Sequence, residues 1–269
     1  MADLERIQNV AKRVAKTFDQ GNDVVVILSA MAGVTDGLIN MAQQITESPD
    51  KRELDVLLAT GEQTTAALLA MTLKQMNYPA LSMLGHQAKV VTDCAFGDAR
   101  IIEIGAEYIM KLIEKRNIVV VAGFQGCDVS GNITTLGRGG SDTSAVAIAS
   151  ALKADICEIY TDVDGIYTAD PNICDKAKKI DRISYDEMLE MASLGAKVLQ
   201  IRSVEFAKKY NVPLHVRSTF TESEGTWVTR EDEDMEKVVV SGVTYDKNEA
   251  KVSILRVPDK PGIASRIFG

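Results

Sequence analysis

The sequence has few of the residues that build disulfides, zinc sites and histidine-dependent active sites. Its 269 residues include four cysteines, none in a C-x-x-C pair: Cys94, Cys127, Cys157 and Cys174. This pattern favours reduced thiols in a cytoplasmic protein over disulfides or bound zinc, and buried or surface thiols without function are the simplest interpretation. The two histidines, His86 and His215, lie outside every motif described below. A histidine base or a phosphohistidine intermediate is therefore not expected.

Clustered positive charge and long apolar runs are also lacking. The net charge is -8, and the basic residues are interleaved with acids, as in KAKKIDR, which argues against a nucleic-acid surface. The first residues, MADLERIQNVAKRV, have no apolar centre like that of a signal peptide. The longest apolar stretch starts at Val24, is broken by Ser29 and Gly33, and is too short to span a bilayer. The sequence predicts a soluble protein.

Short β-branched runs alternate with longer helical patterns along most of the chain. Buried strands are predicted in residues 23–30, 117–124, 154–162 and 212–218. Apolar residues spaced three and four apart predict helices in residues 54–76 and 103–116, and Ser184 and Glu187 have the spacing of a capping box before a further helix. Strands separated by helices imply parallel crossovers. The predicted fold is a three-layer αβα sandwich with a mainly parallel central sheet.

The pattern changes after about Ser218. The stretch TESEGTWVTREDEDMEK is acidic and rich in turn residues, and two strand-like runs follow it, VVVSGVTYD and AKVSILRVPD. This order predicts a linker and then the first part of a small second α/β domain in the last thirty or so residues.

The segment TTLGRGGSDTSAVAIASAL, residues 134–152, places a glycine-rich loop directly before an apolar helix. If Ser141 or Asp142 caps that helix, the loop delivers the chain to a helix N-terminus, where free N–H groups favour an anion. A glycine-rich turn without function has the same composition. Arg138 and Asp142 favour a binding role, because a turn needs neither a guanidinium nor a carboxylate, whereas a carboxylate-binding or phosphoryl-transfer site uses both.

Polar, glycine-bearing loops follow three of the predicted strands. They are SAMAGVTD, GFQGCD and YTDVDGIYTADP. Ligands of open α/β sheets bind beyond the carboxyl ends of the strands, so these loops and GRGG are expected to converge on one site. Glu62, in LATGEQTTAA, is a further candidate, because alanines and leucines surround it in the helix pattern; a solvated helix face is the alternative.

Together these segments resemble the aspartokinases of the amino acid kinase family. VVVILSAMAGVTD, LLATGEQ, VAGFQG, TTLGRGGSDTSA, YTDVDGIYTADP and EMASLGAKVL occur in the family's order and cover nearly the whole chain. The resemblance implies ATP-dependent phosphorylation of the side-chain carboxylate of L-aspartate to 4-phospho-L-aspartate, the first step towards lysine, threonine and methionine. It also implies an amino acid kinase domain in residues 1–222, a linker in 223–236 and the start of an ACT regulatory domain in 237–269.

The resemblance also implies roles for individual residues. Arg138 would bind a carboxylate of aspartate, Glu62 its ammonium group, and Arg138, Asp142 and Lys197 would form the catalytic set. The remaining amino-acid pocket would consist of Thr35, Phe124, Gly139, Gly140, Ser141 and, in a second role, Asp142. The nucleotide would contact Ser29, Ala30, Thr161, Asp162, Tyr167, Asp170, Asn172, Lys197 and Val198, with Lys197 at the phosphates. Mg²⁺ is expected with ATP, held by phosphate oxygens and water and without a dedicated protein ligand.

Two departures from the family pattern stand out. Relatives normally begin with a strand that ends in a K-F-G-G-T-S-like loop, whereas this sequence begins at the helix that should follow it, so the first strand and its loop are expected to be missing. Asn172 occupies a position after Asp-Pro where many relatives have arginine. The resemblance also implies association into homo-oligomers through ACT domains.

Two other functions are compatible with the same sequence. A sibling kinase acting on glutamate or N-acetylglutamate would share the fold, although the arginine of GRGGSD and the acid of ATGEQ favour a free α-amino acid. A ligand-binding or assembly unit without catalysis is the other. Titration with ATP and aspartate, paired with a turnover assay, separates them.

Overall fold

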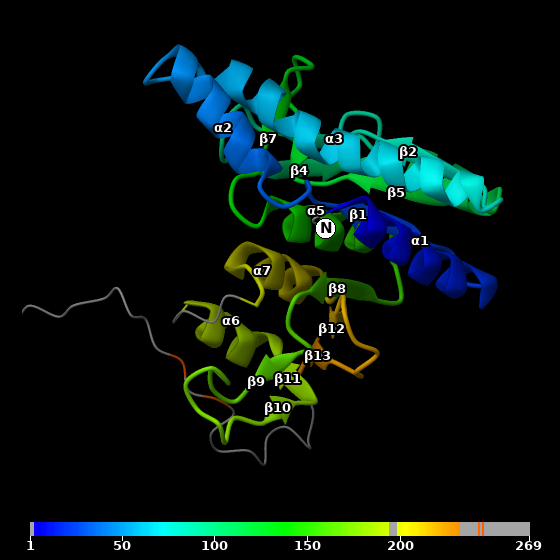
Figure 1. The fold of residues 1–269 in the computed structure, drawn as a ribbon, viewed down its shortest axis with the longest axis vertical. Helices are drawn as coiled ribbons and strands as arrows, with labels where there is room; N and C mark the ends of the chain where they lie inside the picture. Colours follow the sequence, from blue (N-terminus) through cyan, green and yellow to red (C-terminus); the bar gives the residue numbers. More distant parts are fainter. Residues whose placement is uncertain (1–2, 194–197, 232–241, 243, 245–269) are drawn as a thin grey trace, which may run out of the picture.

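The computed structural model describes residues 3–193 and 198–231, together with residues 242 and 244 (Figure 1). It shows an α/β fold with mainly parallel sheets. In this part of the chain the helices are α1 (Leu4–Asp19), α2 (Val34–Ile45), α3 (Lys51–Gln75), α4 (Glu107–Glu114), α5 (Gly140–Leu152), α6 (Tyr185–Ser193) and α7 (Ile201–Tyr210). The strands are β1 (Val25–Leu28), β2 (Ala80–Met83), β3 (Val90–Thr92), β4 (Ile101–Ile104), β5 (Ile118–Ala122), β6 (Gln125–Cys127), β7 (Ile133–Thr135), β8 (Cys157–Thr161), β9 (Ile166–Tyr167), β10 (Lys179–Ile180), β11 (Arg182–Ser184), β12 (Leu214–Ser218) and β13 (Thr226–Thr229).

The first sheet is parallel, in the order β1-β5-β2. Every residue of its central strand β5 is buried, because successive side chains point to opposite faces and helices cover both. Ile118 and Val120 pack in the cluster that contains α1 and α3, whereas Val119 and Val121 pack in the cluster that contains α4 and α5. This arrangement explains the unbroken apolar run, in which each fully buried aliphatic side chain contributes roughly 1.5–3 kcal/mol.

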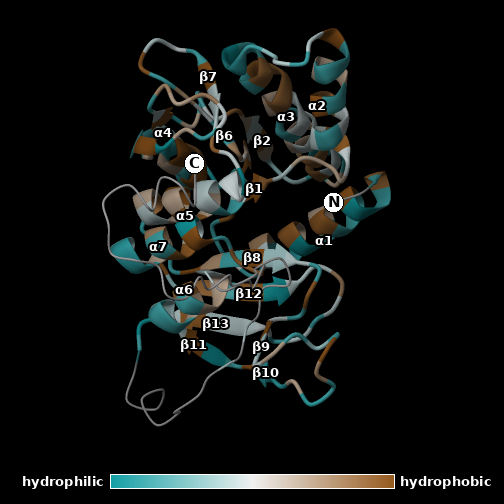
Figure 2. Cartoon of the chain, turned by 90° about the vertical axis from the view of Figure 1, so that its left-hand side faces the viewer, coloured by the Kyte–Doolittle hydropathy of each residue, from teal (hydrophilic) through white to brown (hydrophobic). Residues whose placement is uncertain are grey.

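Helix α1 covers the sheet with one face only. Its buried residues, Ile7, Ala11, Val14 and Ala15, recur at helical spacing, and Figure 2 shows hydrophilic and hydrophobic positions mixed along the same helix. The side chain of Asp3 accepts a hydrogen bond from the N–H of Arg6 and caps its first turn.

Helix α3 has the length and apolar composition of a membrane span, the one helix in the described residues that does, with 50% of the apolar window buried inside the molecule. It packs on β2 and β5, and Leu69 and Leu73 are fully buried. Its position in the core accounts for its apolar character.

A small mixed sheet, β4-β3-β6-β7, lies beside the first sheet and leads the chain into the glycine-rich loop. The buried carboxylate of Asp55 on α3 connects it to the helix layer. Asp55 accepts hydrogen bonds from the N–H and hydroxyl of Thr135 at 2.8 and 2.7 Å, and from the N–H of Gly97 at 3.0 Å. The end of β7 is therefore fixed against the same helix that carries Glu62.

The third sheet has the order β11-β13-β12-β8, and a β9-β10 hairpin lies beside it in the lower part of Figure 1. Strands β8 and β12 are parallel, with Leu214 opposite Cys157. A second core, built from this sheet with residues of α5, α6 and α7, includes the fully buried Met188 and Val204. Helix α5 thus contributes both to this core and to the cluster beside the first sheet.

The capping box at the start of α6 is confirmed. The hydroxyl of Ser184 accepts from the N–H of Glu187 at 3.2 Å, and the Glu187 carboxylate accepts from the N–H of Ser184 at 2.9 Å. The two reciprocal bonds satisfy donors that a helix start leaves unpaired.

Several sequence expectations differ from the structure. Residues 101–104 form β4, with Ile104 opposite Val90, so the helix expected in 103–116 starts only at Glu107, because β-branched isoleucines pair with β3. Residues 226–229, expected in the linker, form β13 between β11 and β12. The predicted α/β fold with mainly parallel sheets is confirmed, and the described strands are divided among four hydrogen-bonded sheets. The expected ACT segment, 237–269, lies outside the described residues apart from positions 242 and 244.

Candidate active site

A pocket of about 300 Å³ lies where α5 begins. Its lining comes from the loop after β1, the start of α2, the middle of α3, the turn after β5, the glycine-rich loop, the first turn of α5 and the residue before α7. The lining residues are Ser29, Thr35, Glu62, Phe124, Gly137, Arg138, Gly139, Gly140, Ser141, Asp142 and Gln200. All eight residues expected in the amino-acid pocket are among them.

The start of α5 differs from the predicted cap. The helix begins at Gly140, and its N-cap is Gly139 in the left-handed region at φ 71°, with no side-chain cap. The expectation that Ser141 or Asp142 caps the helix is therefore wrong, because both lie inside the first turn. Glycine adopts this conformation without a Cβ penalty. Within the described residues the N–H groups of Ser141 and Asp142 have no hydrogen-bond partner, so they remain available to an anion in the pocket.

Glu62 is buried to 4% exposure, and its two carboxylate oxygens differ. Oε1 accepts a hydrogen bond from the N–H of Ala30 at 3.0 Å, whereas Oε2 is buried without a partner among the described residues. Burial raises the pKa of this carboxyl above its ordinary value, and the hydrogen bond from Ala30 opposes that rise. A buried, unpaired carboxylate oxygen costs free energy that a cationic ligand group would recover.

Asp142 is a second desolvated acid in the same pocket. Burial raises the pKa of its carboxyl to about 6, and no described residue donates a hydrogen bond to it. It is mostly ionised at neutral pH. With Glu62 it gives one side of the pocket negative potential.

Arg138 supplies the opposite charge. It is exposed, and its guanidinium makes no ion pair or hydrogen bond with the described residues. A free guanidinium beside the unpaired N–H groups of α5 is suited to bidentate binding of a carboxylate or phosphate. The pocket therefore pairs an anion-binding end with a cation-binding end.

Phe124 enters the pocket on a strained turn. Its φ is 65°, which is uncommon for a bulky residue. The turn is held from both sides, because the N–H of Phe124 donates to the hydroxyl of Ser144 at 3.1 Å and its carbonyl accepts from Leu136 at 2.9 Å.

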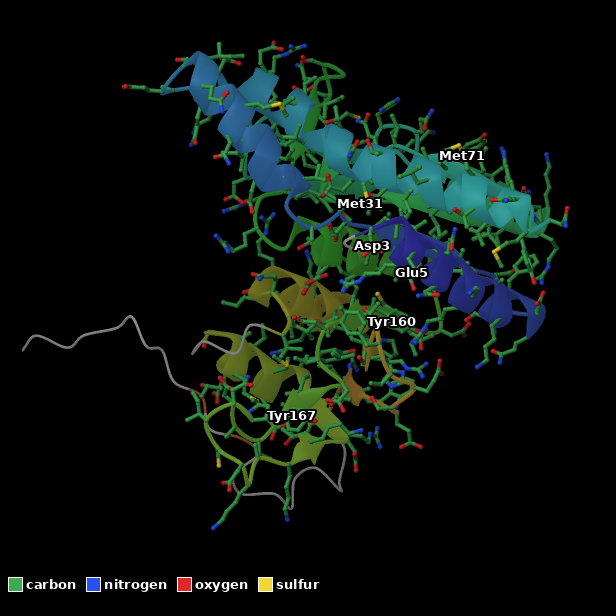
Figure 3. The ribbon with its side chains drawn as sticks, viewed as in Figure 1. Asp3, Glu5, Met31, Met71, Tyr160 and Tyr167 are labelled. Carbon is green, nitrogen blue, oxygen red and sulfur yellow. The ribbon has the colours of Figure 1, made fainter. Side chains whose placement is uncertain are left out.

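The residues expected on the nucleotide side fall into two groups. Ser29 lines the amino-acid pocket and Ala30 supports Glu62, so the loop after β1 serves the same pocket as Arg138. The other described residues of this set lie in the part of the molecule built on β8, where Figure 3 shows Tyr160 and Tyr167 away from Met31 of the β1 loop. They do not line this pocket.

Hydrogen bonds order that second group locally. The hydroxyl of Thr161 donates to Asp162 at 3.1 Å, and Tyr167 donates to Asp164 at 2.7 Å. Asp170 accepts from the backbone and side chain of Asn172 at 2.9 and 3.0 Å. Val198 packs on the core beneath the sheet, and Lys197 lies outside the described residues.

Sequence reasoning missed Gln200. Its side chain lies against Gly139, where an added Cβ would overlap it, and it lines the pocket from the residue before α7. No motif marked it, because it follows GAKV by two positions and reaches the pocket only through the packing of α7 beside α5. The described residues hold no group of three or more His, Cys, Asp or Glu side chains placed to bind a metal ion.

Comparisons with known proteins agree with this architecture. The amino acid kinase family model matches residues 1–218. An aspartate kinase of Stutzerimonas stutzeri is 56% identical over 267 residues, covering 99% of this chain and 65% of its own length. The chain thus spans about 65% of the length of that curated relative.

Solved structures show the same likeness. The aspartate kinase from Synechocystis superposes with a TM-score of 0.76 at 49% identity, over 86% of this chain and 38% of that one. E. coli aspartokinase III in complex with aspartate and ADP superposes with a TM-score of 0.77 at 27% identity, over 87% and 63% respectively. From the family match over residues 1–218 and these relatives, the chain belongs to the amino acid kinase family.

Proposed function

We propose that the protein transfers the γ-phosphoryl group of ATP to the side-chain carboxylate of L-aspartate, giving 4-phospho-L-aspartate and ADP. The observation that carries the proposal is the buried Oε2 of Glu62, which has no partner among the described residues, in a pocket that the Arg138 guanidinium also lines. An α-amino acid with a second carboxylate has an ammonium group for the cation-binding end of the pocket and carboxylates for its anion-binding end. The relatives named aspartate kinase, and one bound to aspartate and ADP, support the same substrate.

Each charged group has a distinct part in binding. The Glu62 carboxylate receives the substrate ammonium, Asp142 adds to the negative potential around it, and Arg138 with the N–H groups of Ser141 and Asp142 receives a carboxylate. An N-acylated amino acid has no ammonium and would leave Oε2 unpaired, which costs roughly 1–3 kcal/mol or more. The pocket therefore favours free aspartate over its N-acetyl derivative.

The chemistry needs alignment rather than a general base. The acceptor is already a carboxylate, so one of its oxygens attacks the γ-phosphorus while the bond from that phosphorus to the β–γ bridging oxygen breaks and ADP leaves. Two anions must be brought together, and fixed positive charge lowers the barrier. Arg138 and the N-terminus of α5 supply it on the amino-acid side, and Lys197 is proposed to do so at the nucleotide phosphates.

The nucleotide is proposed to bind at the carboxyl end of β8. Because β8 follows α5 in the chain and packs on it, the strand returns towards the end of the molecule where α5 begins. Thr161, Asp162, Tyr167, Asp170 and Asn172 offer hydroxyl, carboxylate and amide groups there, beside Val198.

A divalent cation fits the donors of this site. The Asp142 carboxylate has no hydrogen-bond partner among the described residues, and Mg²⁺ commonly uses one or two carboxylates with substrate phosphates and water. When bound with ATP, Mg²⁺ would neutralise charge on the phosphates.

The wider setting follows the relatives. We propose a cytoplasmic enzyme at the start of lysine, threonine and methionine synthesis, which associates into homo-oligomers through ACT domains. These points extend the proposal beyond the pocket, and sedimentation of the protein at several concentrations tests the association.

A coupled ADP-release assay tests the substrate. L-Aspartate, L-glutamate and N-acetyl-L-aspartate are offered at equal concentration with ATP and Mg²⁺. The proposal predicts turnover with L-aspartate at least about tenfold above either analogue, the scale of one lost polar contact. Equal rates with N-acetyl-L-aspartate would show that Glu62 does not select the ammonium group.

A further inference from the structure

The loop that carries Arg138 has few restraints of its own. Gly137 and Gly139 both adopt φ 71°, and α5 has no side-chain cap. The backbone bond from Gly140 to Gly137 at 3.0 Å closes the turn, and the N–H and hydroxyl of Thr143 each donate to the Gly139 carbonyl at 3.1 Å, so these bonds attach the loop to its own helix α5. A guanidinium that binds ligand needs a fixed backbone, because a displacement of about 1 Å can cost a hundredfold in rate.

Arg202, in the first turn of α7, attaches the chain immediately before this loop. Its Nη1 donates to the carbonyl of Leu136 at 2.7 Å and to Oδ1 of Asp98 at 2.8 Å. Its Nη2 donates to the carbonyl of Ala99 at 2.9 Å. The planar guanidinium thus joins two separate segments to one helix, which a lysine ammonium cannot do in the same geometry.

The two segments are also in direct contact. The N–H of Ala99 donates to the carbonyl of Thr135 at 2.9 Å, and a Cβ added to Gly137 would lie 2.8 Å from Oδ1 of Asp98. The first glycine of the loop therefore lies against Asp98, whose side chain accepts a hydrogen bond from Arg202. Leu136 is fully buried, so its carbonyl presents a fixed acceptor.

Helix α7 is a rigid support for this contact. Val204 and Ala207 are fully buried in the second core, and α7 packs beside α5. Gln200, two residues before Arg202, lies against Gly139 on the other side of the loop. The same helix start thus touches the loop at both of its ends.

We propose that Arg202 is a positioning residue: it fixes the Leu136–Gly140 backbone so that Arg138 is held ready for the substrate carboxylate. Arg202 does not line the pocket and acts through the loop. The two carbonyl bonds carry this role. The ion pair with Asp98 contributes little, because the Asp98 side chain is 80% exposed.

The first readout is hydrogen–deuterium exchange of the backbone amides in residues 136–142, which needs no activity. Arg202→Met keeps the length of the side chain and removes its donors. It should speed exchange in this segment at least about tenfold, as expected when a local opening becomes easier, while exchange in β5 stays unchanged. Arg202→Lys should fall between the two. The matched control is Lys208→Met. Lys208 is also on α7, and the variant removes its ion pair with Asp186 of α6. Its exchange rates in residues 136–142 should equal those of the parent.

The second readout rests on the proposed function. Arg202→Met should raise KM for aspartate about tenfold and change KM for ATP less than about twofold, because only the amino-acid side loses its support. Unchanged exchange in residues 136–142 overturns the proposal. So does an equal rise of KM for aspartate and for ATP, if amide exchange is also faster in the whole protein. If Arg202→Met does not fold, Arg202→Lys and Asp98→Asn decide it: the lysine variant must show the local effect and the asparagine variant must not. A parent protein that does not turn over aspartate would refute the proposed function and leave the exchange result to judge Arg202.

Discussion

Glu62 accepts a hydrogen bond at Oε1 from the Ala30 N–H at 3.0 Å, and its second carboxylate oxygen is buried with no partner in the described part of the chain. The bond joins the middle of α3 to the loop after β1, so two pocket walls share one carboxylate. It fixes the direction of the side chain and leaves Oε2 as the acceptor for a ligand. The charge pattern of the pocket depends on this geometry.

Glu62→Gln should weaken aspartate binding by about ten- to a hundredfold, because the amide loses the charge that pairs with an ammonium group. Isothermal titration with aspartate and, separately, with ATP measures it, and the ATP affinity should not change. Glu53→Gln, an exposed acid of the same helix that pairs with Arg52, is the control. Parent-like aspartate affinity in Glu62→Gln would remove Glu62 from the site.

Arg138→Ala should abolish measurable aspartate binding and leave nucleotide binding largely intact. Losing a charge-assisted bidentate contact costs roughly 2–5 kcal/mol, far more than an exposed arginine contributes elsewhere. Arg100→Ala removes an arginine from another exposed position and serves as the comparison. If both variants bind aspartate equally well, the carboxylate is held by another group.

Asp142→Asn should stabilise the protein at neutral pH while impairing its function. The folded pKa of Asp142 is about 6, above the ordinary value for an aspartate, so between the two values the folded state binds more protons and stability falls as pH rises. Removing this desolvated charge should add up to roughly 3 kcal/mol above about pH 6. Thermal unfolding from pH 4 to pH 8 measures it. The gain should disappear towards pH 4, and a constant gain across that range would assign it to another cause.

Gly139→Ala should damage the pocket more than Gly131→Ala. Both glycines have positive φ, so backbone strain destabilises each variant by about 1 kcal/mol. A Cβ at Gly139 also overlaps Gln200, whereas nothing lies within 4 Å of one at Gly131. Only Gly139→Ala should raise KM for aspartate strongly, by about tenfold or more. Equal effects in steady-state kinetics would mean that strain alone matters.

Much of the fold follows from local pattern. The run in residues 117–124 became β5 because it is apolar on both faces, and Ser184 and Glu187 formed their capping box from neighbouring residues alone. The strand in residues 226–229 was not predicted, because their surroundings are acidic and turn-rich and the strand is stabilised by pairing with the distant β11 and β12.

In the site, too, some residues can be found from local sequence and others depend on contacts between distant segments. Polar residues in apolar or glycine-rich surroundings, Glu62 and Arg138, could be found in the sequence. The cap at Gly139 could not, because serine and aspartate are the commoner capping residues and the glycine is selected by close approach to Gln200. Gln200 and Arg202 required the docking of α7, a contact between segments more than sixty residues apart.

The most direct test of the central claim is detection of the product. The protein is incubated with ATP, Mg²⁺ and L-aspartate in the presence of hydroxylamine, which traps an acyl phosphate as a hydroxamate, and the product is identified by mass spectrometry. The account predicts the side-chain hydroxamate of aspartate, formed only with ATP and reduced at least about tenfold in Glu62→Gln. Absence of the hydroxamate, or equal amounts from the parent and Glu62→Gln, would contradict it.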